Sequence, residues 1–202
     1  SDVCSSDLKK FFDTVIADYA IQNAGHIHTT GLLGVIASGT GESQRIGRKI
    51  LLKSIHIHAS LRKEDSTVKA DSSTVVRIIV GIDTQCNGVG PVVGDVLKLT
   101  NPTVLPTNAF NNLSNKGRFI ILKDKYFNLT SLCGAGNGTT NDYGRAYKQF
   151  NYNRKLNIPI NYSSTTGSIS EIRDNVPFMI VSCLFDNDAA IHIHTRSRYT
   201  DV

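Results

Sequence analysis

The chain has 202 residues, of which 40% are hydrophobic and 19% are charged, and its formal net charge is +5. That length suits one domain with a substantial core, and we expect neither disorder nor membrane insertion, because no apolar run reaches the roughly 18 residues of a membrane span. Residues 116–155 carry eight Lys or Arg against two Asp, an excess that would attract polyanions.

Residues 1–8 lack an initiator Met and share no pattern with the rest of the chain. We expect a non-native or disordered leader over residues 1–8 and one domain over residues 9–202. The four cysteines show no CxxC spacing, and we expect all of them to be reduced: Cys4, Cys86, Cys133 and Cys183.

From residue 9 onward, β-rich runs alternate with clusters of Gly, Asn, Pro and Ser, a pattern typical of an all-β protein. Short strands are expected near residues 11–21 and 32–37, and a short helical turn at residues 93–99. Longer strands are expected at residues 48–61, 74–83, 118–129, 147–162 (in pieces), 176–185 and 190–199. About eight strands with long connections and no repeat predict a two-sheet jelly roll.

All six histidines lie in three His-Ile-His triplets, at residues 26–28, 56–58 and 192–194. Successive side chains of a strand point to opposite faces, so each triplet places two imidazoles on one face. In residues 48–61 the isoleucines continue an apolar face, and in residues 190–199 Arg196 and Arg198 share the imidazole face. The imidazoles are therefore predicted to lie outside the core. The pattern leaves the triplet at 26–28 unplaced.

Five runs, in this order and spacing, resemble the capsid proteins of circular, Rep-encoding single-stranded DNA viruses (circovirus-like), and more distantly the coat protein of satellite tobacco necrosis virus. The resemblance covers roughly residues 9–202. The runs are Gly-Thr-Gly-Glu-Ser-Gln-Arg-Ile-Gly-Arg-Lys-Ile at 39–50, Val-Arg-Ile-Ile-Val at 76–80 leading to Asp-Thr-Gln at 83–85, Arg-Phe-Ile-Ile-Leu-Lys-Asp-Lys at 118–125, Asn-Ile-Pro-Ile-Asn-Tyr at 157–162 with Gly-Ser-Ile at 167–169, and Arg-Tyr-Thr-Asp at 198–201.

The resemblance implies a single eight-stranded viral jelly roll with two four-stranded antiparallel sheets, B-I-D-G and C-H-E-F. It implies a non-enzymatic structural protein, found in the virion and in the host nucleus or cytoplasm during assembly, that forms a homo-oligomeric, small (T=1-type) icosahedral shell around single-stranded DNA. The family's long basic arm is represented here only by Lys9 and Lys10. If residues 48–61 form the first long strand and residues 190–199 the last, the resemblance makes them antiparallel neighbours.

Basic residues neutralise phosphates without reading base sequence. On this ground, the residues predicted to contact nucleic acid are Lys9, Lys10, Arg45, Arg48, Lys49, Arg196 and Arg198. By analogy with related coat proteins, Asp201 is a predicted Ca²⁺ ligand between subunits.

Three interpretations remain open for the predicted patch of His56, His58, His192 and His194. The imidazoles are solvated polar residues, or they contact phosphate beside the arginines, or they bind Zn²⁺ or Ni²⁺. None of these three interpretations requires a cofactor.

Two other classes of protein compete with the capsid. A metal-dependent cupin-type enzyme would use His56, His58, Glu64 and one of His192 or His194, although its motif spacing is not met. A cellular jelly-roll trimer of the ligand or lectin kind would require a secretory context, which the expected free thiols disfavour.

Overall fold

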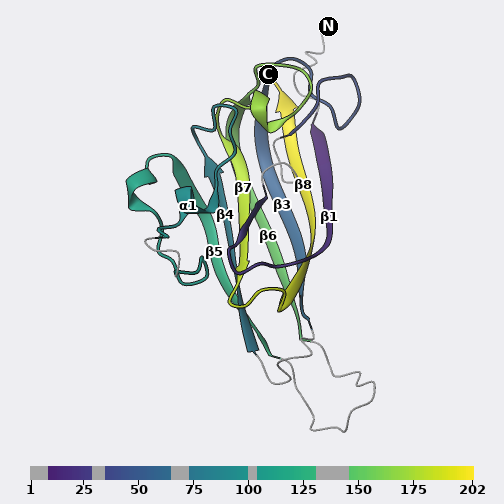
Figure 1. Cartoon of the computed structure of the whole chain (residues 1–202). Coiled ribbons are helices and arrows are strands. Elements are labelled where there is room, and N and C mark those ends of the chain that lie inside the picture. The colour runs from purple at the N-terminus through teal and green to yellow at the C-terminus, as the bar shows by residue number, and fades with distance from the viewer. Residues whose placement is uncertain (1–8, 29–34, 65–72, 100–103, 131–145) are drawn as a thin grey trace, which may run out of the picture.

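The computed structural model describes residues 9–28, 35–64, 73–99, 104–130 and 146–202. These residues form eight strands in two four-stranded antiparallel sheets, with little helix (Figure 1). The strands are β1 (Lys10–Ala20), β2 (His26–His28), β3 (Lys49–Lys63), β4 (Ser73–Asp83), β5 (Phe119–Thr130), β6 (Tyr147–Asn161), β7 (Val176–Cys183) and β8 (Ala189–Asp201). Within the described part of the chain, no helix is long and apolar enough to cross a membrane.

The strand order is β1-β8-β3-β6 in the first sheet and β2-β7-β4-β5 in the second. If the eight strands are lettered B to I in chain order, these orders become B-I-D-G and C-H-E-F. The chain is therefore an all-β jelly roll, as predicted. The last strand, β8, pairs with both β1 and β3.

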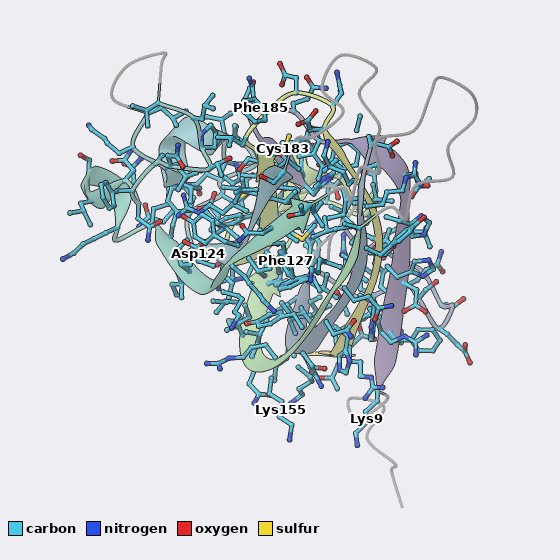
Figure 2. The ribbon with its side chains drawn as sticks, turned by 90° about the horizontal axis from the view of Figure 1, so that it is seen from below. Lys9, Asp124, Phe127, Lys155, Cys183 and Phe185 are labelled. Carbon is cyan, nitrogen blue, oxygen red and sulfur yellow. The ribbon has the colours of Figure 1, made fainter. Side chains whose placement is uncertain are left out.

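The main core lies between the two sheets and is built mostly from aliphatic side chains. On β3 the inward residues Ile55, Ile57 and Leu61 are fully buried, and each such side chain contributes about 1.5–3 kcal/mol by leaving water. Phe127 of β5 meets Phe150 of β6 edge to face, with ring centroids 6.0 Å apart. Figure 2 shows Phe127 among the side chains of this interior, where it joins the two sheets.

A β-bulge in β3 keeps its apolar side chains on one face. The buried residues are Ile50 and Leu52 before the bulge, and Ile55 and Ile57 after it, so the alternation changes phase between them. The pairing register shifts between Leu52 and Ser54 against both neighbouring strands: β3 has the extra residue in its pairing with β8, whereas β6 has it in the pairing of β3 with β6. One extra residue absorbs the phase change, which would otherwise turn half of the strand outward.

The connection between β4 and β5 covers the outer face of the second sheet. It carries the short helix α1 (Val93–Val96) and the 3-10 turn Leu113–Asn115, and Figure 1 shows α1 beside β4 and β5, on the side away from the first sheet. Val96, Leu97 and Ala109 pack in a second apolar cluster with residues of that sheet: Ile79, Phe119, Phe178 and Ile180.

Several details differ from the sequence prediction. Of the strand predicted at residues 32–37, residues 35–37 are described and are not a strand, and the rest lies outside the described residues. The strand at residues 48–61 is not the first long strand, because β1, which precedes it, is itself 11 residues long. Its predicted antiparallel pairing with the last strand is nevertheless confirmed. The helical turn ends at Val96, and β7 ends at Cys183.

Cys86 and Cys183 are buried free thiols, as predicted. The leader predicted at residues 1–8 lies outside the described residues, as do Cys4 and Cys133.

Candidate functional site

The outer face of the first sheet, called here the open face, is polar and carries the histidine and arginine residues singled out in the sequence. Its side chains form rows across the strands, because residues in register on neighbouring strands lie side by side. In β1-β8-β3-β6 order the rows are Phe11, Arg198, Ser54 and Lys155; then Asp13, Arg196, His56 and Asn153; then Val15, His194, His58 and Asn151; and finally His192, Ser60 and Gln149.

The predicted patch of four imidazoles is present on this face. His58 lies directly opposite His194, and His56 lies opposite Arg196. The Nε2 atoms of His192 and His194 are 3.0 Å apart, so one ring donates to the other. His58 Nδ1 lies 2.9 Å from the side-chain oxygen of Asn151.

Arg196 is held by an acidic side chain of the neighbouring strand. Its Nε and one terminal nitrogen donate to the two carboxylate oxygens of Asp13, at 2.7 and 2.5 Å. This forked contact lowers the pKa of Asp13 below its usual value. Forked pairing is also how arginine recognises phosphate, so Asp13 occupies the position that a phosphate would take.

Arg198 stands in the next row, between Phe11 on β1 and Ser54 on β3, neither of which is acidic. Together with burial, Arg198 and Arg196 both contribute to a lowered pKa of His56. Burial is the main cause that lowers the pKa of His56, followed by the positive charge of Arg198, by His58 and by Arg196. The two arginines therefore place positive charge beside His56 on this part of the face.

A hollow of about 320 Å³ runs between β1, β8 and β3 on the open face. The arginines and the imidazoles of His56, His58 and His194 line it, and Asp13 is the acidic residue on its wall. A smaller hollow of about 190 Å³ continues toward β6, and it shares His58 and His194 with the first. The open face is thus grooved, and it offers cationic donors and neutral polar donors together.

The residues of the alternative cupin-type site do not all come together. Glu64 is eight residues beyond His56 on an extended chain, a separation of about 26 Å at 3.3 Å per residue. Its carboxylate lies 2.6 Å from Nε of Arg62 instead. Among the described residues, no group of three or more His, Cys, Asp or Glu side chains is placed to hold a metal ion. The binding of Zn²⁺ or Ni²⁺ by the imidazoles remains an untested prediction.

Five of the seven basic residues predicted to contact nucleic acid are exposed: Lys9, Arg48, Lys49, Arg196 and Arg198. Figure 2 shows Lys9, just before β1, and Lys155, on β6, extending away from the sheets.

Arg45 is not available to phosphate, contrary to the prediction, because its side chain is fully buried. Its guanidinium lies 3.9 Å from the centre of the Tyr162 ring. Nε donates to the carbonyl of Ile36 at 2.8 Å, and the other nitrogens donate to the carbonyls of Gly47 and Ser164. The guanidinium therefore donates to carbonyl groups of three separate segments. We conclude that Arg45 has a structural role.

The prediction for Lys10 is wrong for a similar reason. Its side chain is 3% exposed, and its ammonium lies 2.8 Å from Oδ2 of Asp201 and donates to the carbonyl of Gln44 at 2.8 Å. The other carboxylate oxygen of Asp201 accepts a hydrogen bond from the backbone of Ile46. Asp201 thereby ties β8 to β1 and to the segment before β3. Its binding of Ca²⁺ remains an untested prediction.

The triplet at 26–28 is placed by the structure in β2, at the edge of the second sheet. His28 is buried, and its Nε2 lies 3.0 Å from the hydroxyl of Tyr19 on β1. Burial, and secondarily His26, lowers the pKa of His28 to about 4. This triplet therefore lies apart from the open face, and its second imidazole joins the two sheets.

Phe11 and Asp13 are residues of the open face that the sequence did not reveal. The strand near residues 11–21 reads Phe-Phe-Asp-Thr-Val-Ile, with an apolar residue on each face, so its alternation does not identify the outward side. Only the pairing with β8 shows that both residues point outward.

The strand order and the open face define the class of this protein as a jelly-roll domain with one grooved, basic sheet face. No protein-family model matches the chain, and no curated protein matches it. Among solved structures, it is similar to Desmodium yellow mottle tymovirus, at 11% identity with a TM-score of 0.37, covering 96% of this chain and 86% of that one. It is also similar to the 60-mer BFDV capsid protein, at 10% identity with a TM-score of 0.32, covering 96% and 93%. All these TM-scores are below 0.5, and the fold assignment rests on this chain's own strand order.

Proposed function

We propose that this protein is a structural capsid subunit that self-assembles into a small, T=1-type icosahedral shell enclosing single-stranded DNA. One observation carries the proposal: the sheets have the B-I-D-G and C-H-E-F order that the resemblance to circovirus-like capsid proteins implies. Because one fold serves many functions, this order needs support from the surface of the molecule. Such a protein acts in the virion and has no enzymatic activity.

Exposed apolar residues on the β4–β5 connection support self-association. Phe110 is 87% exposed and Leu113 is 75% exposed, and both line a hollow of about 620 Å³. Large exposed apolar side chains that gather at one place mark contact surfaces. A shell subunit must present such surfaces to symmetric copies of itself.

The exposed basic residues support the DNA part of the proposal. Lys9, Arg48, Lys49, Arg196 and Arg198 can neutralise phosphates without reading base sequence. In an assembled shell, these residues would contact the packaged DNA from the inner wall.

Particle size tests the proposal. The purified chain is examined at neutral pH by multi-angle light scattering and negative-stain electron microscopy. We expect closed, uniform shells of tens of subunits. A monodisperse monomer, dimer or trimer over a range of salt and protein concentrations would contradict the capsid function, and a trimer would favour the cellular jelly-roll class.

A further inference from the structure

We propose that the hollow on the open face is a binding site for single-stranded nucleic acid, in which Arg198 holds a phosphate, Phe11 stacks a base and Asp13 acts as a built-in competitor for Arg196. The inference deepens the proposed function and rests on it only for the identity of the packaged nucleic acid. It concerns a site with a defined location, whereas charge alone would predict diffuse attraction.

The phosphate position follows from the contents of neighbouring rows. In the row of Arg196 the chain supplies its own anion, since Asp13 takes both guanidinium donors. In the row of Arg198 the neighbours across the strands are Phe11 and Ser54, and Lys155 completes the row. An anion that enters the hollow therefore meets Arg198 without having to displace a carboxylate.

The imidazoles that line the hollow suit a phosphodiester. His56 lies opposite Arg196, and its pKa is lowered, so it can donate one hydrogen bond to a phosphate oxygen as a neutral ring. His58 and His194 lie in the next row along the same hollow. Hydrogen-bond donors that follow one another along the hollow match a chain of phosphates better than a single small anion.

Phe11 distinguishes a nucleic acid from other polyanions. Its side chain is 39% exposed on the open face, beside Arg198, and the Arg196 guanidinium lies 5.1 Å from the centre of its ring. An exposed aromatic ring next to cationic groups is the arrangement on which unpaired bases stack. A base in a duplex is already stacked and paired, so this ring favours the single strand.

The competitor can be removed without disturbing the fold. Asp13 and Arg196 are 43% and 48% exposed, and exposed ion pairs contribute little to stability. Asp13→Asn keeps the shape of the side chain and releases Arg196 for a second phosphate. Asp18→Asn is the matched control, because it changes the net charge equally on the same strand. Asp18 contacts Arg62, which keeps a second contact with Glu64. Asp18 also lies 3.4 Å from Nδ1 of His192, a residue that does not line the hollow of Arg196 and Arg198.

The test measures binding of the full chain to a labelled oligothymidylate by fluorescence anisotropy at several salt concentrations. One added arginine–phosphate contact should tighten binding by Asp13→Asn roughly threefold to tenfold and steepen the salt dependence of log K by about 0.7. Asp18→Asn should change the slope much less. Arg198→Gln should weaken binding and flatten the slope by a similar amount, whereas Lys116→Gln, an exposed charge on the β4–β5 connection, should have a smaller effect.

Phe11→Leu identifies the ligand class. Loss of one stacked base should weaken oligothymidylate binding about fivefold or more, while binding of inorganic polyphosphate stays unchanged. Equal losses for both ligands would overturn the role of Phe11. Equal responses of Asp13→Asn and Asp18→Asn would overturn the competitor.

Light scattering on the same samples separates the two proposals. If shells form normally but oligothymidylate binding is unchanged in the Asp13 and Arg198 variants, the binding site is refuted and the capsid function is not. If the expected binding changes occur in a protein that forms no shells, the capsid function is refuted and the binding site is not.

Discussion

The hydroxyl of Tyr19 lies 3.0 Å from Nε2 of His28, and this contact joins β1 of the first sheet to β2 of the second. The two rings meet edge to face with centroids 5.1 Å apart, and the ring of His26 lies 4.4 Å from that of His28. His28 is 8% exposed. Burial, together with the neighbouring imidazole of His26, disfavours the charged form of His28, so the ring is neutral in the folded chain.

The burial of His28 predicts that stability falls as the pH is lowered through the range between the two pKa values of this residue. Its pKa is about 4 in the folded chain and 6.5 in the unfolded chain. Between these values the unfolded state binds the proton that the folded state does not, so stability rises with pH. The contribution is complete above pH 6.5 and is lost by about pH 4, an effect of about 3 kcal/mol.

Urea unfolding of the wild type and of His28→Gln between pH 4 and pH 7 measures this effect. The variant keeps a polar partner for Tyr19 but has no proton to take up, so its stability should depend less on pH over this range. His194→Gln, which changes an exposed imidazole of the open face, serves as the control. A pH dependence that is identical in wild type and His28→Gln would refute the role of His28.

Arg45 is predicted to be essential for stability and irrelevant to DNA affinity. Arg45→Met leaves the carbonyls of Ile36, Gly47 and Ser164 without their donors. Loss of one partner from a buried, charged network costs about 3–5 kcal/mol. Arg48→Met, at an exposed position nearby, should change stability by less than about 0.5 kcal/mol.

Urea unfolding measures both arginine variants, and oligothymidylate binding is measured on the folded protein. Arg45→Met should bind like the wild type wherever it is folded. Weakened binding at unchanged stability would restore Arg45 as a nucleic-acid contact.

The bulge in β3 predicts that deletion of one residue is tolerated. Deletion of Lys53 brings Ile50, Leu52, Ile55 and Ile57 into one continuous alternation, so all four face the core without the extra residue. We expect the deletion variant to fold, and we expect Lys53→Ala, which keeps the residue count, to change stability by less than about 0.5 kcal/mol. Circular dichroism and urea unfolding compare the two variants. Loss of folded protein on deletion of Lys53 would show that the bulge itself, and not only the apolar alternation, is required for the fold.

Much of the fold could be predicted because the long strands alternate strongly. The isoleucines of β3 and β8 alternate with His and Arg, and this pattern fixed both the buried face and the shared outer face. β2 was missed because three residues are too few for a period to show. The strand predicted at residues 32–37 was suggested by an apolar run alone, which does not separate strands from packed loops.

The site was predictable only where the strand phase was clear. His56, His58, His192 and His194 were placed together correctly, whereas Phe11 and Asp13 belong to a strand with apolar residues on both faces. Arg45 was misjudged because charged residues in a Gly-rich run are usually exposed. Its burial depends on carbonyls of three separate segments, and local sequence carries no signal for such a convergence.

Assembly should depend on the apolar residues of the β4–β5 connection. Phe110 and Leu113 are the two most exposed large apolar side chains beside the 620 Å³ hollow. Phe110→Ser removes an anchor from the proposed subunit contact but no packing from the subunit, because the ring is 87% exposed. We therefore expect free subunits of wild-type stability and a loss of shells, seen by light scattering and electron microscopy.

Val89→Ser is the matched control for Phe110→Ser. Val89 is 70% exposed on the same connection but is not part of the hollow's lining, so its substitution should leave assembly unchanged if the hollow makes the contact. Shells formed by Phe110→Ser at wild-type concentrations would place the subunit contact elsewhere. Equal loss of shells in both variants would indicate that general hydrophobicity of the connection, and not a specific fit at the hollow, drives association.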